Sequence, residues 1–103
     1  MEQNNINEIN ECYLGVLAKI ELLTADTDGY VAGQVVNNIE KDILEVAAMY
    51  DTFADSTGNN IARNKQVLLD DVRRKTTGKP LKDKISLFRK LRQQESSFVD
   101  ANS

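Results

Sequence analysis

Two stretches of this chain place apolar side chains at alternating intervals of three and four residues, the spacing of a helix with one buried face. The first comprises Ile6, Ile9, Tyr13, Val16, Ile20 and Leu23, and the second comprises Val36, Ile39, Ile43, Val46, Tyr50 and Phe53. This spacing predicts two long amphipathic helices, at about residues 4–24 and 28–54. Joined by a tight bend, they are expected to form an antiparallel hairpin with a crossing angle near about +20°.

The bend at residues 24–35 shares part of its spacing with an EF-hand calcium loop. Asp26, Asp28 and Gly29 fall at its third, fifth and sixth positions, but Val35 stands where the loop needs a bidentate Glu. Two carboxylates are too few for a cation that takes many more oxygen ligands. We interpret the stretch as a turn in which an Asp or Thr side chain caps the second helix. A calcium sensor is the weakest alternative.

Two shorter helices are predicted in the second half of the chain. Turn-forming residues at 55–60 interrupt the apolar spacing, and a third helix is expected at about 60–76. Gly78 suits the position after its end, and Pro80 suits the start of a fourth helix at about 80–97. The residues expected to face inward are Ile61, Leu68, Leu69, Val72, Leu81, Ile85, Phe88 and Leu91. With no strand-like alternation, the predicted fold is an all-α, four-helix bundle-like domain.

The length of 103 residues predicts a single domain, 1–103, with fraying expected at residues 1–4 and 98–103. No apolar run reaches the length of a membrane span, and the acidic start lacks the features of a signal peptide. The one cysteine, Cys12, excludes an internal disulfide and fits a reducing compartment. We therefore expect a cytoplasmic protein, in the host cytosol if the chain is viral.

Two small residues of the first helix carry packing expectations. Gly15 costs a helix about 1 kcal/mol relative to Ala, so a close helix crossing is expected there, helped by Ala18 one turn later. Cys12 is expected to be buried beside the same seam as a small hydrophobe. Its charged neighbours, Glu8 and Glu11, are acidic and would not activate a thiol.

The composition removes most routes to catalysis. The chain has no histidine, so Ser-His and Cys-His nucleophilic pairs are unavailable, as is the Glu-x-x-His di-iron pattern. Gly78 and Lys79 match the end of a phosphate-binding loop, but Pro80 stands where that loop needs Ser or Thr. The many carboxylates suit solvated helix faces. We expect no enzymatic activity, no catalytic or metal-binding residues, no cofactor and no small-molecule substrate.

Charge is divided unevenly between the two halves of the chain. Residues 1–55 hold eleven acidic and two basic side chains, a net charge of −9, whereas residues 56–103 hold five acidic and eleven basic side chains, a net charge of +6. Asymmetry of this kind indicates a docking surface for an acidic partner or for nucleic acid. The candidate surface residues are Arg73, Arg74, Lys75, Lys79, Lys82 and Arg89.

Three interpretations of this asymmetry stay open. In the first, Glu40, Asp42 and Glu45 lie against the basic helices of the same chain or of a second copy, where ion pairs set the register. In the second, the 73–84 connection and the fourth helix contact nucleic-acid phosphates, although the acidic hairpin would repel them. In the third, the basic half docks an acidic protein.

The functional hypothesis is a small, non-enzymatic protein–protein interaction module: an adaptor, inhibitor or regulator that presents helical and charge-divided surfaces to a partner. A nucleic-acid-binding regulator is the alternative, and a homodimer is a further expectation, but membrane association is not expected. In the polar tail, Phe98 and Val99 are interpreted as a cover for the end of the bundle, with a docking peptide as the alternative.

Overall fold

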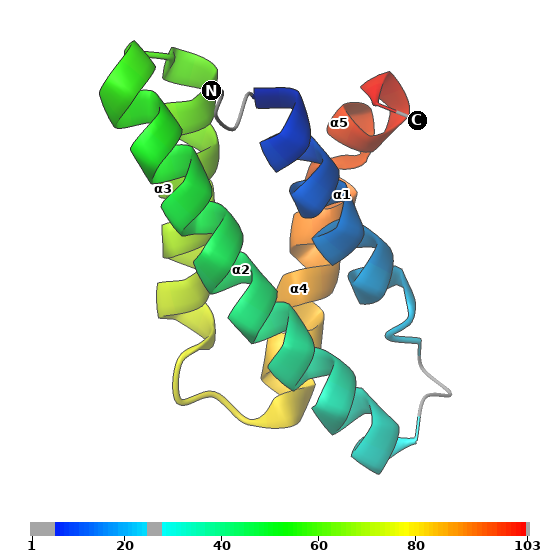
Figure 1. Ribbon diagram of the computed structural model, residues 1–103. Coiled ribbons are helices and arrows are strands. Elements are labelled where there is room, and N and C mark those ends of the chain that lie inside the picture. The colour runs from blue at the N-terminus through cyan, green and yellow to red at the C-terminus, as the bar shows by residue number, and fades with distance from the viewer. Residues whose placement is uncertain (1–5, 25–27, 103) are drawn as a thin grey trace.

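The computed structural model describes residues 6–24 and 28–102, which form an all-α bundle of five helices (Figure 1). The helices are α1 (Ile6–Glu21), α2 (Gly29–Thr57), α3 (Asn60–Thr76), α4 (Leu81–Gln94) and α5 (Ser96–Ala101). Figure 1 shows α2 running diagonally across the bundle, with α4 behind it and α1 and α3 on opposite sides. The described ranges contain no strand. The predicted all-α, bundle-like fold is therefore confirmed.

The hairpin of α1 and α2 is antiparallel and buries the two predicted seams. Tyr50 Oη donates to Asn10 Oδ1 at 2.7 Å, and Lys19 pairs with Asp42 further along, so α2 runs back beside α1. Because fully burying one apolar side chain stabilises a fold by about 1.5–3 kcal/mol, the buried residues of these seams supply a large part of the stability of the core. Their buried members are Ile9, Tyr13, Val16, Ile20, Leu23, Val36, Ile39, Ile43, Val46 and Tyr50.

Side-chain caps fix where α2 and α3 begin. Asp28 Oδ1 accepts a hydrogen bond from the Tyr30 N–H at 2.8 Å, and Asn59 Oδ1 accepts one from the Ala62 N–H at 2.8 Å. Each cap satisfies one of the N–H groups that the first turn of a helix leaves unpaired. The predicted Asp cap at the start of the second helix is thus confirmed. The remainder of the bend, at residues 25–27, lies outside the described residues.

Glycines with positive φ end α2 and α3. Gly58, with φ of 70°, donates its N–H to Ala54 O at 2.8 Å and closes α2 three residues later than expected, at Thr57. Gly78, with φ of 78°, follows the end of α3 as predicted. Pro80, predicted as the first helical residue, is the N-cap of α4, so the helix begins one position later, at Leu81.

The inward face of α3 differs from the prediction at its first residue. Ile61 is 65% exposed, and the buried face consists of Ala62, Leu69, Val72 and Thr76. Neighbouring residues of an α-helix point about 100° apart, so the row that contains Ala62 and Leu69 turns Ile61 toward solvent. The prediction that Ile61 faces inward was wrong, because Ala62, the next residue, occupies the buried row.

Two expectations for α1 are wrong. Cys12 is exposed rather than buried. A side-chain carbon added at Gly15 would meet no other described atom within 4 Å, so no close helix crossing occurs there. Both residues are exposed next to the buried seam residues Tyr13 and Val16, at the edge of a hollow between α1 and α2. Nothing in the structure explains why position 15 is glycine.

The predicted fraying from residue 98 is also wrong, since residues 96–101 form α5. The fourth helix breaks at Glu95, which is only 8% exposed. The ring of Phe98 packs against that of Tyr13, with centroids 5.2 Å apart, and Val99 is half-buried against the core. This apolar pair therefore covers the end of the bundle, as expected. Residues 1–4 and 103 lie outside the described residues.

A buried ion pair holds this end of the bundle together. Lys65 Nζ of α3 lies 2.6 Å from Glu95 Oε2, and the two side chains are only 16% and 10% exposed. The same Nζ lies 4.3 Å from the ring centroid of Phe98 and 5.6 Å from that of Tyr13. A cation over aromatic faces is stabilised by their negative quadrupole. Tyr50 of α2 meets Tyr13 edge to face, at 6.1 Å between centroids. Side chains from four helices and from the α4–α5 junction thus converge here.

Removing one partner of this ion pair should be costly, because the other charge remains buried without compensation. We expect Lys65→Ala to lower the free energy of unfolding by about 3 kcal/mol, measured by urea denaturation. The double variant Lys65→Met/Glu95→Leu should recover most of the loss, since an apolar pair has no desolvation cost. Lys75→Ala is the control, because Lys75 is exposed on the same helix. An equal loss in the control would contradict the assignment.

The two buried tyrosine hydroxyls differ in hydrogen bonding. Tyr50 Oη donates to Asn10, whereas Tyr13 Oη lies near the Glu95 carboxylate without a hydrogen bond of good geometry among the described residues. Burial raises the pKa of Tyr13 well above its ordinary value, and the carboxylate of Glu95 raises this pKa further. The pKa of Tyr50 is raised by the same two causes in the same order. The folded protein therefore holds both phenolic protons tightly.

Phenylalanine substitutions should separate the two tyrosines. Tyr13→Phe removes an unpaired hydroxyl and should leave the free energy of unfolding unchanged or raise it by up to about 1 kcal/mol. Tyr50→Phe leaves Asn10 without its donor and should lower the free energy of unfolding by about 1 kcal/mol.

Above about pH 10 the unfolded chain loses phenolic protons that the folded chain keeps, so the free energy of unfolding should fall as the pH rises. Tyr13→Phe should reduce that fall in urea titrations at about pH 8 and 11. Equal destabilisation by both variants at pH 8 would show that Tyr13 Oη has a partner.

Candidate functional site

The cations at the end of α3 are paired within their own helix. Arg74 lies 2.7 Å and Lys75 3.0 Å from the carboxylate of Asp71, and Arg73 lies 3.7 Å from that of Asp70. Hydrogen bonds from Lys75 and Arg74 lower the pKa of Asp71 below its ordinary value. Three of the six predicted surface residues therefore have an internal counter-charge.

Other cations of the basic half pair across the bundle. Lys84 of α4 lies 2.9 Å from Glu40 of α2, as the first interpretation expected for that carboxylate. Asp42, by contrast, pairs with Lys19 of α1 rather than with the basic half. Glu45 has no ion pair within the described part of the chain.

Arg63 and Arg92 also join the two halves of the chain. Arg63 of α3 bridges Asp51 and Asp55 of α2, at 2.6 and 2.7 Å, and Arg92 of α4 pairs with Glu21 of α1. Such exposed or half-exposed pairs contribute about 0–1 kcal/mol each. Together they match the acidic and basic halves and explain part of the charge asymmetry.

The cations left over are concentrated between the end of α3 and the end of α4. Lys79, Lys82, Arg89 and Lys90 are exposed, and none has an ion-pair partner among the described residues. Elsewhere in the described ranges, only Lys41 on α2 is a cation that is both exposed and without an ion-pair partner. The unpaired positive charge of the basic half is thus confined to one connection and one helix.

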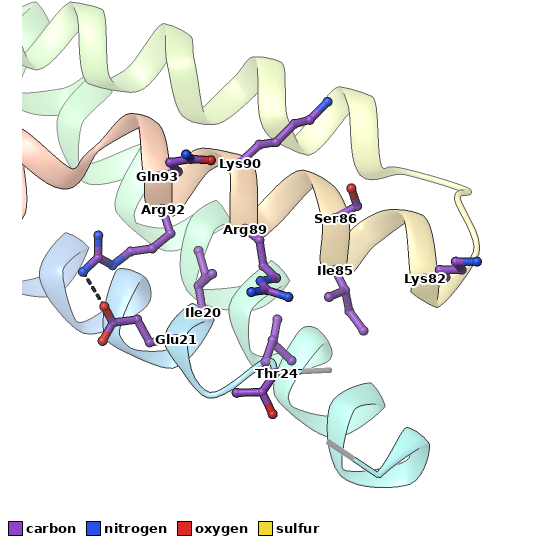
Figure 2. A pocket seen from close by; sticks show the side chains of 11 residues that line it. Ile20, Glu21, Thr24, Lys82, Ile85, Ser86, Arg89, Lys90, Arg92 and Gln93 are labelled. Carbon is purple, nitrogen blue, oxygen red and sulfur yellow. Dashed lines mark hydrogen bonds and ion pairs between the residues drawn. The ribbon is translucent and has the colours of Figure 1, made fainter. Parts of the chain in front are cut away.

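A groove of about 950 Å³ lies between the C-terminal end of α1 and the length of α4 (Figure 2). Figure 2 shows Arg89 and Ile85 pointing from α4 toward the end of α1, while Lys90 extends away from it. A dashed line joins Arg92 to Glu21 across the groove. Its remaining lining residues are Ile20, Leu23, Thr24, Lys82, Ser86 and Gln93.

The lining of this groove is strongly basic. Four cations contribute to it, namely Lys82, Arg89, Lys90 and Arg92, against one carboxylate, Glu21. Because Glu21 is taken up by Arg92, three positive charges remain without a counter-charge in the described lining. The apolar part of the floor is small: Ile20 and Leu23 are each only 1% exposed, which leaves the half-buried Ile85 as the main accessible apolar side chain.

The structure divides the six predicted surface residues. Lys82 and Arg89 line the groove, Lys79 lies in the connection before α4, and Arg73, Arg74 and Lys75 are outside the lining. Sequence reasoning missed the contribution of α1, because only the fold brings its C-terminal end to α4. Helical spacing could have assigned Arg92 to the site, because residues three and seven positions apart, such as Arg89 and Ile85 before Arg92, lie on one face of a helix.

Two smaller hollows lie elsewhere on the surface. One, of about 280 Å³, lies between α1 and α2 beside Cys12 and Gly15, and the other, of about 240 Å³, lies beside α5 and shares Glu21 and Arg92 with the main groove. Among the residues that the structure describes, no three His, Cys, Asp or Glu side chains are placed to hold a metal ion. No helix within those ranges is long and apolar enough to cross a bilayer.

Comparisons of this chain with protein-family models, with curated proteins and with solved structures found no match.

The pairing pattern predicts how lysines differ in reactivity. Lys65 and Lys84 are ion-paired and only 16% and 21% exposed, so their amines should acetylate slowly. Lys79, Lys82 and Lys90 should be modified first, because neither an ion pair nor burial protects them. Limited acetylation of the folded protein followed by peptide mass spectrometry measures the order. Equally fast modification of Lys84 and Lys82 would contradict the pairing.

Proposed function

We propose that this protein is a small, non-enzymatic interaction module that binds an acidic protein partner through the groove between α1 and α4. The observation that carries the proposal is the placement of the unpaired cations. Seven of the eleven basic side chains of residues 56–103 have an ion-pair partner, yet Lys82, Arg89 and Lys90 line one groove without a counter-charge. A cationic groove of this kind steers an acidic partner and accelerates its association.

The proposed mechanism is occupancy rather than chemistry. The groove residues are four cations, one amide, two hydroxyls, aliphatic side chains and the carboxylate of Glu21, which pairs with Arg92, and the chain has no histidine to act as a base near neutral pH. Binding there would mask a surface of the partner, as expected for an adaptor, inhibitor or regulator. The groove volume lies at the upper end of ordinary ligand sites, which suits a protruding segment of a macromolecule.

A nucleic-acid-binding regulator is the second candidate, since the same unpaired cations would contact phosphates. One feature favours a protein. The groove lining contains no aromatic side chain on which a base could stack. The carboxylate of Glu21, which α1 supplies to the groove, would repel either kind of anionic partner and pairs with Arg92, so the absence of stacking side chains is the feature that favours a protein.

A homodimer is proposed as a property of the free protein. Leu44, Ile61 and Val67 are more than half exposed on α2 and α3, and self-association would cover apolar surface of this kind. Sedimentation over a wide concentration range measures it, and a constant mass of 11.6 kDa would exclude the dimer.

Fluorescence anisotropy with two labelled polyanions tests the proposed function. Labelled poly-glutamate should bind the wild-type protein, and Lys82→Glu/Arg89→Glu should weaken binding roughly tenfold, equivalent to about 0.7 kcal/mol per reversed charge. The matched control, Arg73→Glu/Arg74→Glu, reverses two cations outside the groove and should weaken binding less than about threefold.

A labelled DNA duplex, titrated at about 50 and 200 mM salt, distinguishes the second candidate. Duplex binding that is tighter than poly-glutamate binding, falls steeply with salt and is lost in Lys82→Glu/Arg89→Glu would favour nucleic acid. Equal losses in the groove variant and its control would show that the groove is not the binding surface.

A further inference from the structure

The shape and chemistry of the α1–α4 groove restrict the kind of acidic segment that it can hold. This argument rests on the proposed function and concerns the conformation and sequence pattern of the partner. Strand addition requires a free sheet edge, and the described residues contain no strand. Recognition of a polyproline helix requires an aromatic-lined groove, whereas the lining here contains no aromatic residue. Recognition of an acidic motif by clustered cations and the docking of a helix in a groove are the modes that fit this lining; the spacing of the cations favours a partner that combines them, an acidic helix.

The spacing of the groove cations fits a helical partner. Lys82 and Arg89 both line the groove and are seven residues apart on α4, which is about 10 Å along the helix axis. Between them, Ile85 points toward the end of α1 (Figure 2). A partner helix lying along α4 would match this row with two carboxylates seven residues apart and an apolar residue between them. Residues at such intervals lie on one face of a helix.

An internal carboxylate already occupies part of the site. Glu21 pairs with Arg92, but the side chain of Glu21 is 56% exposed whereas that of Arg92 is 23% exposed. Fewer packing contacts therefore hold the acid than the guanidinium, so less packing is lost if Glu21 turns into solvent than if Arg92 does. Glu21 and Arg92 also line the hollow beside α5. Displacement of the Glu21 side chain would therefore connect this hollow with the α1–α4 groove.

We infer that the occupant of the groove is an acidic amphipathic helix of a partner protein. Its carboxylates pair with Lys82 and Arg89, its apolar face contacts Ile85, and a further carboxylate displaces Glu21 from Arg92. Glu21 thereby acts as an internal competitor for Arg92, which the carboxylate of the partner must displace.

Two peptides of identical composition test the inference. The first places glutamates seven residues apart with leucines between them on one helical face, and the second scrambles the same residues so that no face is amphipathic. We expect the first peptide to bind at least about tenfold more tightly than the scrambled peptide. It should gain helical circular dichroism on binding and shift the amide resonances of α4 and of the end of α1.

Point variants locate the contacts. Ile85→Ala should weaken binding of the amphipathic peptide about threefold to tenfold and leave that of the scrambled peptide unchanged. Glu21→Gln should tighten binding about threefold, because Arg92 becomes available. Glu11→Gln is the matched control, since it removes the same charge from an exposed position of α1 outside the groove. Equal tightening by both would overturn the role of Glu21.

The outcomes separate the inference from the function on which it rests. Equal binding of the two peptides, with both weakened by Lys82→Glu/Arg89→Glu, would overturn the helical occupant and leave an acid-binding groove. Binding of neither peptide at low salt would overturn both. A duplex DNA that binds more tightly than either peptide and displaces it from the groove would replace the protein partner with nucleic acid.

Discussion

The ion pair between Lys65 and Glu95 determines how the C-terminal part of the chain packs. Its two charges are almost completely removed from water, so each depends on the other and on the aromatic rings around them. Because Glu95 stands at the break between α4 and α5, the pair directs α5 back over the bundle and brings Phe98 onto Tyr13. Glu95 also stands only two residues after Gln93, which lines the groove between α1 and α4. The ion pair is therefore close in sequence to the C-terminal part of the groove.

Much of the fold could be predicted because it follows from one repeated apolar spacing. The apolar spacing that identifies α1 and α2 as amphipathic helices lies within each helix. Capping residues such as Asp28 and Asn59 likewise bind N–H groups within a few residues of their own position. Prediction failed where a partner distant in the sequence decides the outcome. Glu95 is an ordinary charged residue in a polar tail until Lys65, thirty residues earlier, is placed beside it.

The same distinction applies to the candidate site. The excess of positive charge in the second half was apparent from composition, but the useful quantity is the charge that remains after pairing. Arg74 and Lys75 are matched by Asp71 within one helical turn, a local relation that sequence spacing could have revealed. The pairing of Lys84 with Glu40 and the approach of Glu21 to α4 depend on tertiary structure. Only when the ion-paired cations are set aside does Arg89 stand out as one of the few cations without a counter-charge.

The exposure of Cys12 has a practical consequence for work on this molecule. It is the only thiol in the chain and lies beside the shallow hollow between α1 and α2, away from the residues that line the groove. A spectroscopic label attached there would need no engineered cysteine and would leave the apolar seam undisturbed. It would also sit on the same helix whose other end forms one wall of the groove. The chain thus carries a natural attachment point from which distances to a bound partner can be followed.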